Sequence, residues 1–362
     1  MKKLQVAVLF GGVSSEHEVS RRSACAVMAH LDPEKYELLR VGITKKGEWL
    51  LFGGDNAQIP NGEWERHADN VPCQFSLDPH KPGLLLPAQG RTLPVDVVFP
   101  VLHGKNGEDG TVQGLLELAH LPYVGCGVLA SSVCMDKAAT NMLLAQNGIA
   151  EAKFVWFYSA DYKKDPAPIE REIAEKLGYP VFVKPANAGS SVGVSKAHAP
   201  SELAQAIAVA AHEDGRVVVE EAIDGREVEC AVLGNNEPVA SVVGEILPTV
   251  EFYTYDAKYA DASSKLAIPA ELPAETAETI RRTAVQAYRM LGCTGLSRVD
   301  FFVRRSDGAV LLNELNTLPG FTAISMYPKL FEASGVPFEA LTDRLIALAQ
   351  ERFAASQGEV HA

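Results

Sequence analysis

Four polar side chains in the C-terminal part of the chain have types and spacing that could bind a metal ion and an anion: Arg298, Asp300, Glu314 and Asn316. They lie in or beside two apolar runs, 296–303 and 309–315, which have strand composition and are joined by a Ser-Asp-Gly turn signal. Because side chains alternate along a strand, the first two share one face and the last two share another. A hairpin that pairs these faces would bring three oxygen ligands and a guanidinium together. Such oxygen ligands suit Mg2+, which predicts phosphoryl chemistry.

A solvated strand face is the alternative explanation for these charges. A single Asp or Glu on a strand is usually a surface group or half of a surface ion pair. Here, however, Asp300 interrupts an apolar run, and Glu314 and Asn316 flank Leu315. Burying such groups without partners costs a few kcal/mol each. The pattern alone leaves both the metal site and the solvated face open.

Length and composition indicate a soluble globular protein of two or three domains. The chain has 362 residues, of which 47% are hydrophobic and 22% are charged. Its net charge of -13 argues against a general nucleic-acid or membrane-surface partner. No apolar run reaches the roughly 20 residues that cross a bilayer, and the N-terminus lacks the form of a signal peptide. The six cysteines form no C-x-x-C pair, so we expect reduced core cysteines in a cytoplasmic protein.

The N-terminal part of the chain has the pattern of an open α/β sheet. Residues 4–10 form a strand candidate, and a glycine loop and a helical pattern follow, which Ser14 or Ser15 could cap. This unit would leave backbone N–H groups at a helix start. Residues 95–102 form a second strand, and ligands of such sheets lie beyond the strand C-termini. Residues 53–94 are rich in Pro, Asn and Gly and stay unclassified.

The rest of the chain divides into a small α+β unit of about 90 residues and a larger unit from 223 to 362. The helices and strands expected in them, besides the hairpin, lie at 169–177, 180–183, 201–212, 217–221, 275–291 and 337–353.

The segment 189–193, Gly-Ser-Ser-Val-Gly, could wrap phosphate oxygens closely. It is no G-x-x-x-x-G-K-[ST] loop, and it lies between two strand-like segments. A plain flexible turn is the commoner explanation for this composition. Lys184 just before it favours a phosphate site, because its charge would neutralise phosphate while the loop supplies N–H donors. Lys137 is a second candidate, although a lone lysine is usually a surface residue.

Six segments, in this order, resemble the D-alanine–D-alanine ligase family of the ATP-grasp superfamily. They are Gly11-Gly12-x-Ser14-x-Glu16-His17-Glu18-Val19-Ser20, His103-Gly104-x-x-Gly107-Glu108-Asp109-Gly110, Met135-Asp136-Lys137, Phe182-Val183-Lys184-Pro185, Gly189-Ser190-Ser191-x-Gly193 and Asn313-Glu314-x-Asn316-Thr317-x-Pro319-Gly320-Phe321-Thr322. The likeness runs through nearly the whole chain and is greatest for the longer form of the family. The first two segments make it specific, because the wider superfamily shares only the lysines and the metal carboxylates.

The resemblance implies an α/β (α+β) ATP-grasp fold of three domains. These would be an N-terminal open parallel α/β substrate-binding domain (1–127), a small central α+β domain (128–222) and a larger C-terminal α+β domain (223–362) with a lid loop at about 248–268. ATP would bind between the last two. The family also implies a cytoplasmic homodimer that uses ATP, D-alanine and two Mg2+ (or Mn2+), with no nucleic-acid or membrane partner.

The implied reaction makes D-alanyl-D-alanine for peptidoglycan. ATP would phosphorylate the carboxylate of one D-alanine, and the amine of a second would attack the acyl phosphate, releasing ADP and phosphate; positioning and charge neutralisation would do most of the catalysis. Residues matching the family's substrate and oxyanion positions are Glu16, His103, Arg298, Gly320, Ser325 and Met326. Residues matching its nucleotide positions are Lys137, Lys184, Ser190, Ser191, Glu220, Glu221, Ile223, Glu227 and Lys258. The metal ligands would be Asp300, Glu314 and Asn316.

The polar, aromatic segment 251–265 has the composition of a lid, although an aromatic-pinned surface loop fits composition as well. In the family, Lys258 would touch phosphate, and Tyr259 would hydrogen-bond with Ser190 and Glu16, closing the lid and excluding water. Related ligases that make D-alanyl-D-lactate carry His in place of Tyr259, so an amine is expected as second substrate. The alternatives are a D-alanyl-D-lactate or D-alanyl-D-serine ligase, or a non-catalytic nucleotide-binding regulator.

Overall fold

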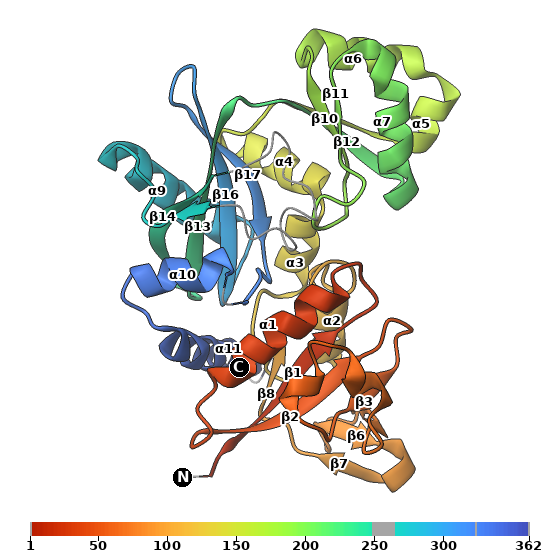
Figure 1. Cartoon of the computed structure of the whole chain (residues 1–362), viewed down its shortest axis with the longest axis vertical. Helices are drawn as coiled ribbons and strands as arrows, with labels where there is room; N and C mark the ends of the chain where they lie inside the picture. Colours follow the sequence, from red (N-terminus) through yellow and green to blue (C-terminus); the bar gives the residue numbers. More distant parts are fainter. Residues whose placement is uncertain (1, 248–264, 323, 361–362) are drawn as a thin grey trace.

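The computed structural model of the chain describes residues 2–247, 265–322 and 324–360. Figure 1 shows three groups of elements, each built on its own sheet: the N-terminal group at the bottom, the group containing β10 and β12 at the upper right, and the C-terminal group on the left. The predicted lid residues Lys258 and Tyr259 lie outside the described residues.

The first sheet has the order β4-β3-β2-β1-β8. Its strands are β1 (Leu4–Gly11), β2 (Tyr36–Ile43), β3 (Trp49–Leu51), β4 (Val71–Pro72) and β8 (Val97–Pro100). β1 is parallel to both β2 and β8, which confirms the predicted open sheet and its two expected strands. The sheet as a whole is mixed, because β3 is antiparallel to β2 and β4 is antiparallel to β3. Helix α1 (His17–Ala29) follows β1, and α2 (Thr111–Leu118) follows β8. The N-cap residue of α1 is Glu16, and no side chain makes a capping hydrogen bond there. The expected cap by Ser14 or Ser15 is therefore wrong.

Residues 53–94, which the sequence left unclassified, form 3-10 turns and a small additional sheet within the N-terminal group, β5-β6-β7. The turns are η1 (Asn56–Gln58), η2 (Glu63–Arg66) and η3 (Pro87–Gln89), and the strands are β5 (Gln74–Phe75), β6 (Leu84–Leu86) and β7 (Arg91–Leu93). Trp64 pins this segment to the first sheet: it is fully buried and packs edge-on against Phe10. A Cβ on Gly42 would lie 2.1 Å from the Trp64 ring, so the sheet needs glycine there.

The second group is an antiparallel sheet, β11-β10-β12-β9, covered by helices. Its elements are β9 (Phe154–Tyr158), α5 (Ser159–Lys164), α6 (Pro166–Lys176), β10 (Val181–Pro185), β11 (Ser195–Ala197), α7 (Pro200–Glu213) and β12 (Arg216–Glu221). Ile173 of α6 and Leu203 of α7 share one core with Val183 and Val217, so both helices cover the same face. The glycine-serine loop joins β10 to β11, as expected.

The third group is a five-stranded antiparallel sheet, β15-β14-β13-β16-β17. Its elements are β13 (Gly225–Leu233), β14 (Val239–Leu247), β15 (Lys265–Ala267), α9 (Ala274–Met290), β16 (Leu296–Arg304), β17 (Val310–Asn316), α10 (Met326–Ala333) and α11 (Phe338–Val360). Cys230, Val299 and Phe301 belong to the core that α9 covers. Since side chains alternate, Arg298 and Asp300 point to the opposite face.

A shared hydrophobic core joins the first and third groups. It contains Val8 of β1, Val27 of α1, Leu330 of α10 and Leu345 of α11. This packing brings Glu16, which follows β1, and His103, which follows β8, into one cavity with Arg298 and Asp300 of β16.

Helices α3 (Val128–Met135) and α4 (Lys137–Gln146) connect the groups. Cys134 of α3 lies in the core of the third sheet, and α3 contacts β17. Helix α3 belongs in sequence to the expected central domain but packs against the third sheet. The domain boundaries at 127/128 and 222/223 therefore stay predictions.

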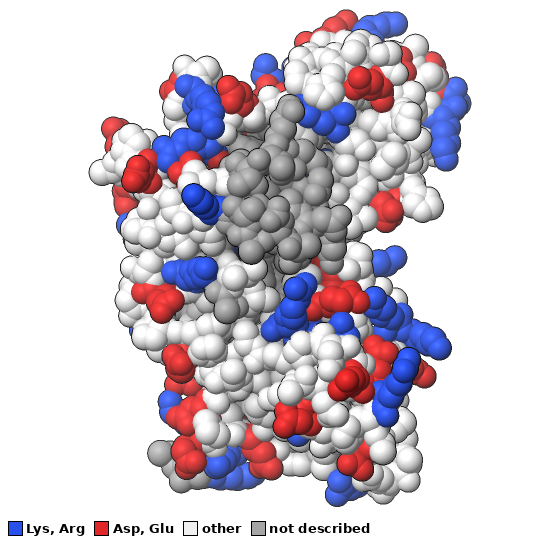
Figure 2. Space-filling view, in the orientation of Figure 1, with Lys and Arg blue, Asp and Glu red and all other residues white. Residues whose placement is uncertain are grey.

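The surface carries both signs of charge. Figure 2 shows acidic and basic side chains interspersed over the face in view. Among the described residues, no helix is both long and apolar enough to cross a bilayer. All six cysteines are free thiols, and all but Cys25 are buried, as expected of core cysteines.

Candidate active site

The predicted hairpin pairs in the register that the alternation required. Arg298 of β16 lies opposite Asn316 of β17, and Asp300 lies opposite Glu314. On the other side of β16, Asp300 lies opposite Glu229 of β13. Three carboxylates therefore occupy neighbouring positions across three strands, an arrangement that like-charge repulsion opposes unless a cation is present.

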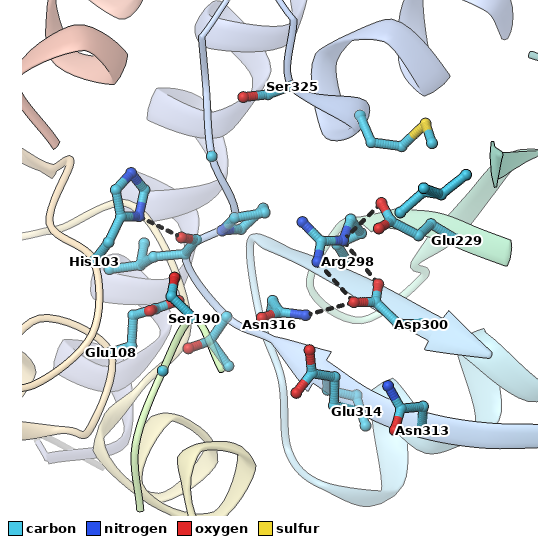
Figure 3. A pocket seen from close by; sticks show the side chains of 18 of the residues that line it. His103, Glu108, Ser190, Glu229, Arg298, Asp300, Asn313, Glu314, Asn316 and Ser325 are labelled. Carbon is cyan, nitrogen blue, oxygen red and sulfur yellow. Dashed lines mark hydrogen bonds and ion pairs between the residues drawn. The ribbon is translucent and has the colours of Figure 1, made fainter. Parts of the chain in front are cut away.

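Arg298 supplies that cation. Its Nε donates to Asp300 Oδ1 and its Nη2 to Asp300 Oδ2, both at 2.7 Å, and Nε lies 2.9 Å from Glu229 Oε2 (Figure 3). Burial lowers the pKa of the guanidinium, but the carboxylates of Asp300 and Glu229 outweigh burial and raise that pKa well above its ordinary value. A bidentate pair of this kind also fixes the orientation of both groups.

The residues around Asp300 fit a hard cation. Asn316 Nδ2 donates to Asp300 Oδ2 at 3.0 Å, so the Asn316 amide and the Asp300 carboxylate are held together. An ionised carboxylate offers about four acceptor positions, so a carboxylate such as that of Asp300 can accept hydrogen bonds and bind a metal ion at the same time. With Glu314 opposite, the donor set is all oxygen, the set that Mg2+ prefers. Among the described residues, no group of three or more His, Cys, Asp and Glu side chains is arranged to hold a metal ion by itself.

Glu16 enters the same cavity from the turn before α1. It is buried at 4% exposure and accepts a hydrogen bond from Ser190 Oγ of the glycine-serine loop. Two glycines enclose its carboxylate: a Cβ would lie 2.4 Å from Glu16 Oε2 at Gly104 and 2.7 Å from it at Gly189. Glycine at both positions therefore leaves the space in which the carboxylate sits.

His103 connects the first sheet to the loop after β17. Its Nδ1 lies 3.0 Å from the Leu318 carbonyl, which can only accept, so Nδ1 carries the proton. Its Nε2 then accepts from Ser23 Oγ at 3.1 Å. Burial lowers the pKa of His103 below its ordinary value, so the ring is neutral. With this tautomer, His103 donates to the Leu318 carbonyl and so holds the loop that carries Gly320.

The opposite side of the cavity is the N-terminus of α10. Ser325 is the N-cap residue and makes no side-chain cap bond within the helix. Its Oγ instead accepts from the Thr322 N–H at 2.9 Å, beside Gly320. The start of α10 therefore presents backbone N–H groups near the cavity, which favours an anion there.

The two predicted phosphate lysines lie in different surroundings. Lys137, the first residue of α4, donates from Nζ to the Ala188 carbonyl at 2.8 Å and lines the cavity. Lys184 Nζ lies 2.5 Å from Glu220 Oε2, and Asn141 Nδ2 donates to Glu220 Oε1 at 3.2 Å. Burial lowers the pKa of Lys184, but the Glu220 carboxylate outweighs burial, and the net shift is upward.

Most of these groups line one cavity of about 500 Å3, a volume typical of small-ligand sites. The predicted site residues that line it are Glu16, His103, Lys137, Ser190, Glu227, Arg298, Asp300, Glu314, Asn316, Gly320, Ser325 and Met326. Those that are described but are not part of its lining are Lys184, Ser191, Glu220, Glu221 and Ile223. Of these, Glu221 Oε1 accepts from the Lys153 N–H at 2.8 Å.

Four charged or amide side chains for which no role was expected also line the cavity: Glu108, Glu229, Asn313 and Lys329. Glu229 left a signal, because it is an acidic residue within an apolar strand and alternates with Glu227. Glu108 lies in the quoted Gly-Glu-Asp-Gly segment. Lys329 is three residues after Met326, so only the helix start at Met326 reveals that the two share a face.

Comparisons with known proteins agree with this geometry. Residues 5–126 match the family model "D-ala D-ala ligase N-terminus", and residues 143–347 match "D-ala D-ala ligase C-terminus". The D-alanine–D-alanine ligases of Acetivibrio thermocellus and Caldicellulosiruptor bescii are each 51% identical to the chain; the first alignment covers 97% of both chains, and the second covers 97% of this chain and 96% of the relative.

Solved structures give the same result. The VanG D-Ala:D-Ser ligase of Enterococcus faecalis superposes with a TM-score of 0.88 at 42% identity, covering 96% of this chain and 100% of that one. The D-alanine–D-alanine ligase of Coxiella burnetii gives a TM-score of 0.86 at 36% identity, covering 99% and 98%. The fold is thus the ATP-grasp fold, and the chain belongs to the D-alanine–D-alanine ligase family.

Proposed function

We propose that the protein joins two D-alanines into D-alanyl-D-alanine, using ATP and passing through a D-alanyl phosphate. The observation that carries this proposal is the cavity in which Glu16 faces the Arg298–Asp300–Glu314 cluster. One wall suits the ammonium of an amino acid, and the other suits a phosphorylated carboxylate. The family likeness also supports a cytoplasmic homodimer that serves peptidoglycan synthesis.

The first D-alanine would bind with its ammonium at Glu16 and its carboxylate toward Arg298. The carboxylate oxygen attacks the γ-phosphorus of ATP, the bond to the β-phosphate oxygen breaks, and ADP leaves. Lys137 and Lys184 would neutralise charge on the phosphates. Asp300, Glu314 and Asn316 would hold Mg2+, which screens phosphate charge when it is bound.

The second D-alanine would place its carboxylate at the N-terminus of α10, near Ser325 and Met326, where the helix dipole favours an anion. Its free amine attacks the acyl carbon, the C–O bond to phosphate breaks, and the amine proton leaves to solvent. Arg298 and the Gly320 N–H would stabilise the oxyanion of the tetrahedral intermediate. The proposal also assigns Tyr259 to a lid bond with Ser190 and Glu16, and Lys258 to phosphate.

Oxygen labelling tests this chemistry. D-alanine carrying 18O in its carboxylate is incubated with ATP and Mg2+, and the phosphate and dipeptide are examined by mass spectrometry. We expect one 18O in each released phosphate, because the carboxylate oxygen that attacked ATP leaves with it. Dipeptide formed with unlabelled phosphate would contradict an acyl phosphate.

Gly189→Ala is expected to raise the KM for the first D-alanine about tenfold or more with little change in the melting temperature. The added Cβ would meet Glu16 Oε2 at 2.7 Å, and the carboxylate is the mobile end of a side chain, so it moves rather than the backbone. Gly215→Ala is the matched control, because a Cβ there has no described neighbour within 4 Å. Steady-state kinetics with unchanged D-alanine KM in Gly189→Ala would argue against Glu16 as the ammonium site.

A further inference from the structure

Glu108 is a second carboxylate in the part of the cavity assigned to the ammonium group. It follows β8 in the loop that begins at His103, and Figure 3 shows it near Ser190. Glu16 lines the same cavity. The reaction steps above give it no task.

The backbone of Gly104 places the two carboxylates close together. The Gly104 N–H donates to Glu108 Oε2 at 2.7 Å. A Cβ on the same residue would lie 2.4 Å from Glu16 Oε2. Both carboxylates thus contact one residue, and that residue has a left-handed φ of 69° that glycine adopts without strain. Ser190 Oγ donates to the other oxygen of Glu16, so Glu16 is oriented from two sides.

Two carboxylates this close repel each other when both are ionised, so ionising the second one is unfavourable. Burial, and after it the charge of Glu16, raise the pKa of Glu108, while the amides of Gly104 and Leu318 and the charge of Arg298 lower it; together they bring that pKa to about 8. His103, which begins the same loop, is neutral. The cationic side chains of the described cavity lining are Lys137, Arg298 and Lys329. Near pH 7, Glu108 is therefore mainly protonated when the cavity holds no cation.

We propose that Glu108 shares the ammonium of the first D-alanine with Glu16 and releases its proton to solvent when that ammonium binds. The inference rests on the proposed function, because it takes the ligand to be an amino acid bound by its ammonium. The bound cation favours the ionised carboxylate, so binding lowers the pKa of Glu108. D-alanine binding and proton release are then linked, and affinity for D-alanine rises with pH until Glu108 is ionised in the free enzyme.

Calorimetry measures the linkage directly. D-alanine is titrated into the full chain holding Mg2+ and a non-hydrolysable ATP analogue, in buffers that differ in ionisation enthalpy. For a carboxyl with a pKa near 8, we expect about 0.9 proton released per first-site D-alanine at pH 7 and about a quarter of a proton at pH 8.5. Glu108→Gln should release almost none at either pH.

Glu151→Gln is the matched control. Burial also raises the pKa of Glu151 to about 8, but Glu151 lies before β9 and is not part of the described cavity lining. Its replacement should leave the proton release unchanged. Kinetics supply a second readout: KM for the first D-alanine should fall about tenfold per pH unit between pH 6 and 7.5 in the wild type, and should lose this slope in Glu108→Gln.

Equal proton release from wild type and Glu108→Gln would overturn the inference, as would a wild type that binds D-alanine without releasing a proton. If Glu108→Gln does not fold, the wild-type pH series alone decides. Failure of the proposed function looks different: D-alanine would neither bind nor yield labelled phosphate. A wild type that passes the 18O experiment but shows no proton release contradicts the role of Glu108 alone.

Discussion

Arg298→Ala is expected to lower kcat roughly 1,000-fold, the upper range for loss of one oxyanion donor. The guanidinium has two tasks in this account. It would stabilise the oxyanion, and it separates the charges of Asp300 and Glu229 through contacts of 2.7–2.9 Å. The side chain of Arg298 is 18% exposed, so the carboxylates that it leaves behind have little solvent to replace it. Steady-state kinetics with ATP and D-alanine provide the measurement.

Arg298→Lys should recover only part of this loss. An ammonium is a point charge and cannot reproduce two parallel N–H bonds to Asp300. Arg226→Ala is the matched control in the same sheet, because Arg226 makes a bidentate pair with Glu245, with contacts of 2.7 and 2.5 Å, outside the cavity. It should reduce stability and change kcat by only a few-fold. Similar kcat losses in both alanine variants would show that Arg298 acts through stability.

Lys184→Met is expected to lower the free energy of unfolding by about 3–5 kcal/mol, the range for breaking a buried ion pair. The Lys184 and Glu220 side chains are 15% and 8% exposed, so the Glu220 charge would remain buried, with the Asn141 amide as its side-chain hydrogen-bond donor among the described residues. The same variant should raise the KM for ATP at least tenfold, since Lys184 would contact its phosphates. Denaturant unfolding and ATP kinetics measure the two effects.

The double variant Lys184→Met/Glu220→Gln separates these effects. Removing both charges removes the buried charge imbalance, so most of the stability should return. The KM for ATP should stay high, because the phosphate contact is still absent. Lys176→Met is the surface control: the Lys176 and Glu172 side chains are 59% and 44% exposed, and exposed pairs contribute little. A double variant as unstable as Lys184→Met would contradict the ion-pair explanation.

The polar face of the hairpin was predictable because strand periodicity is local. Arg298, Asp300, Glu314 and Asn316 needed only alternation and a turn to converge, and their pairing is confirmed. The parallel strands β1, β2 and β8 of the first sheet and the helices of the second group were predictable for the same reason. Roles for single residues came from the family likeness instead.

Other features depend on contacts that local patterns do not encode. Residues 53–94 fold around buried Trp64, whose partners Phe10 and Gly42 are distant in sequence. The cap of α1 was mispredicted because Ser14 Oγ donates to the His103 carbonyl, 89 residues away, at 2.7 Å. Local patterns also gave no role to Glu108. It lies close to Glu16 only because the turn before α1 packs against Gly104 in the loop that carries Glu108.

The most direct test of the central claim is phosphate release with ATP, Mg2+ and D-alanine at neutral pH, with D-lactate or D-serine offered as the competing second substrate. We expect that D-alanine is preferred and that D-alanyl-D-alanine is the main product. The family resemblance puts Tyr259 at the position where ligases that use D-lactate carry His, which favours an amine over D-lactate. The two relatives of 51% identity are D-alanine–D-alanine ligases, which favours D-alanine over D-serine. A clear preference for D-lactate or D-serine would contradict it.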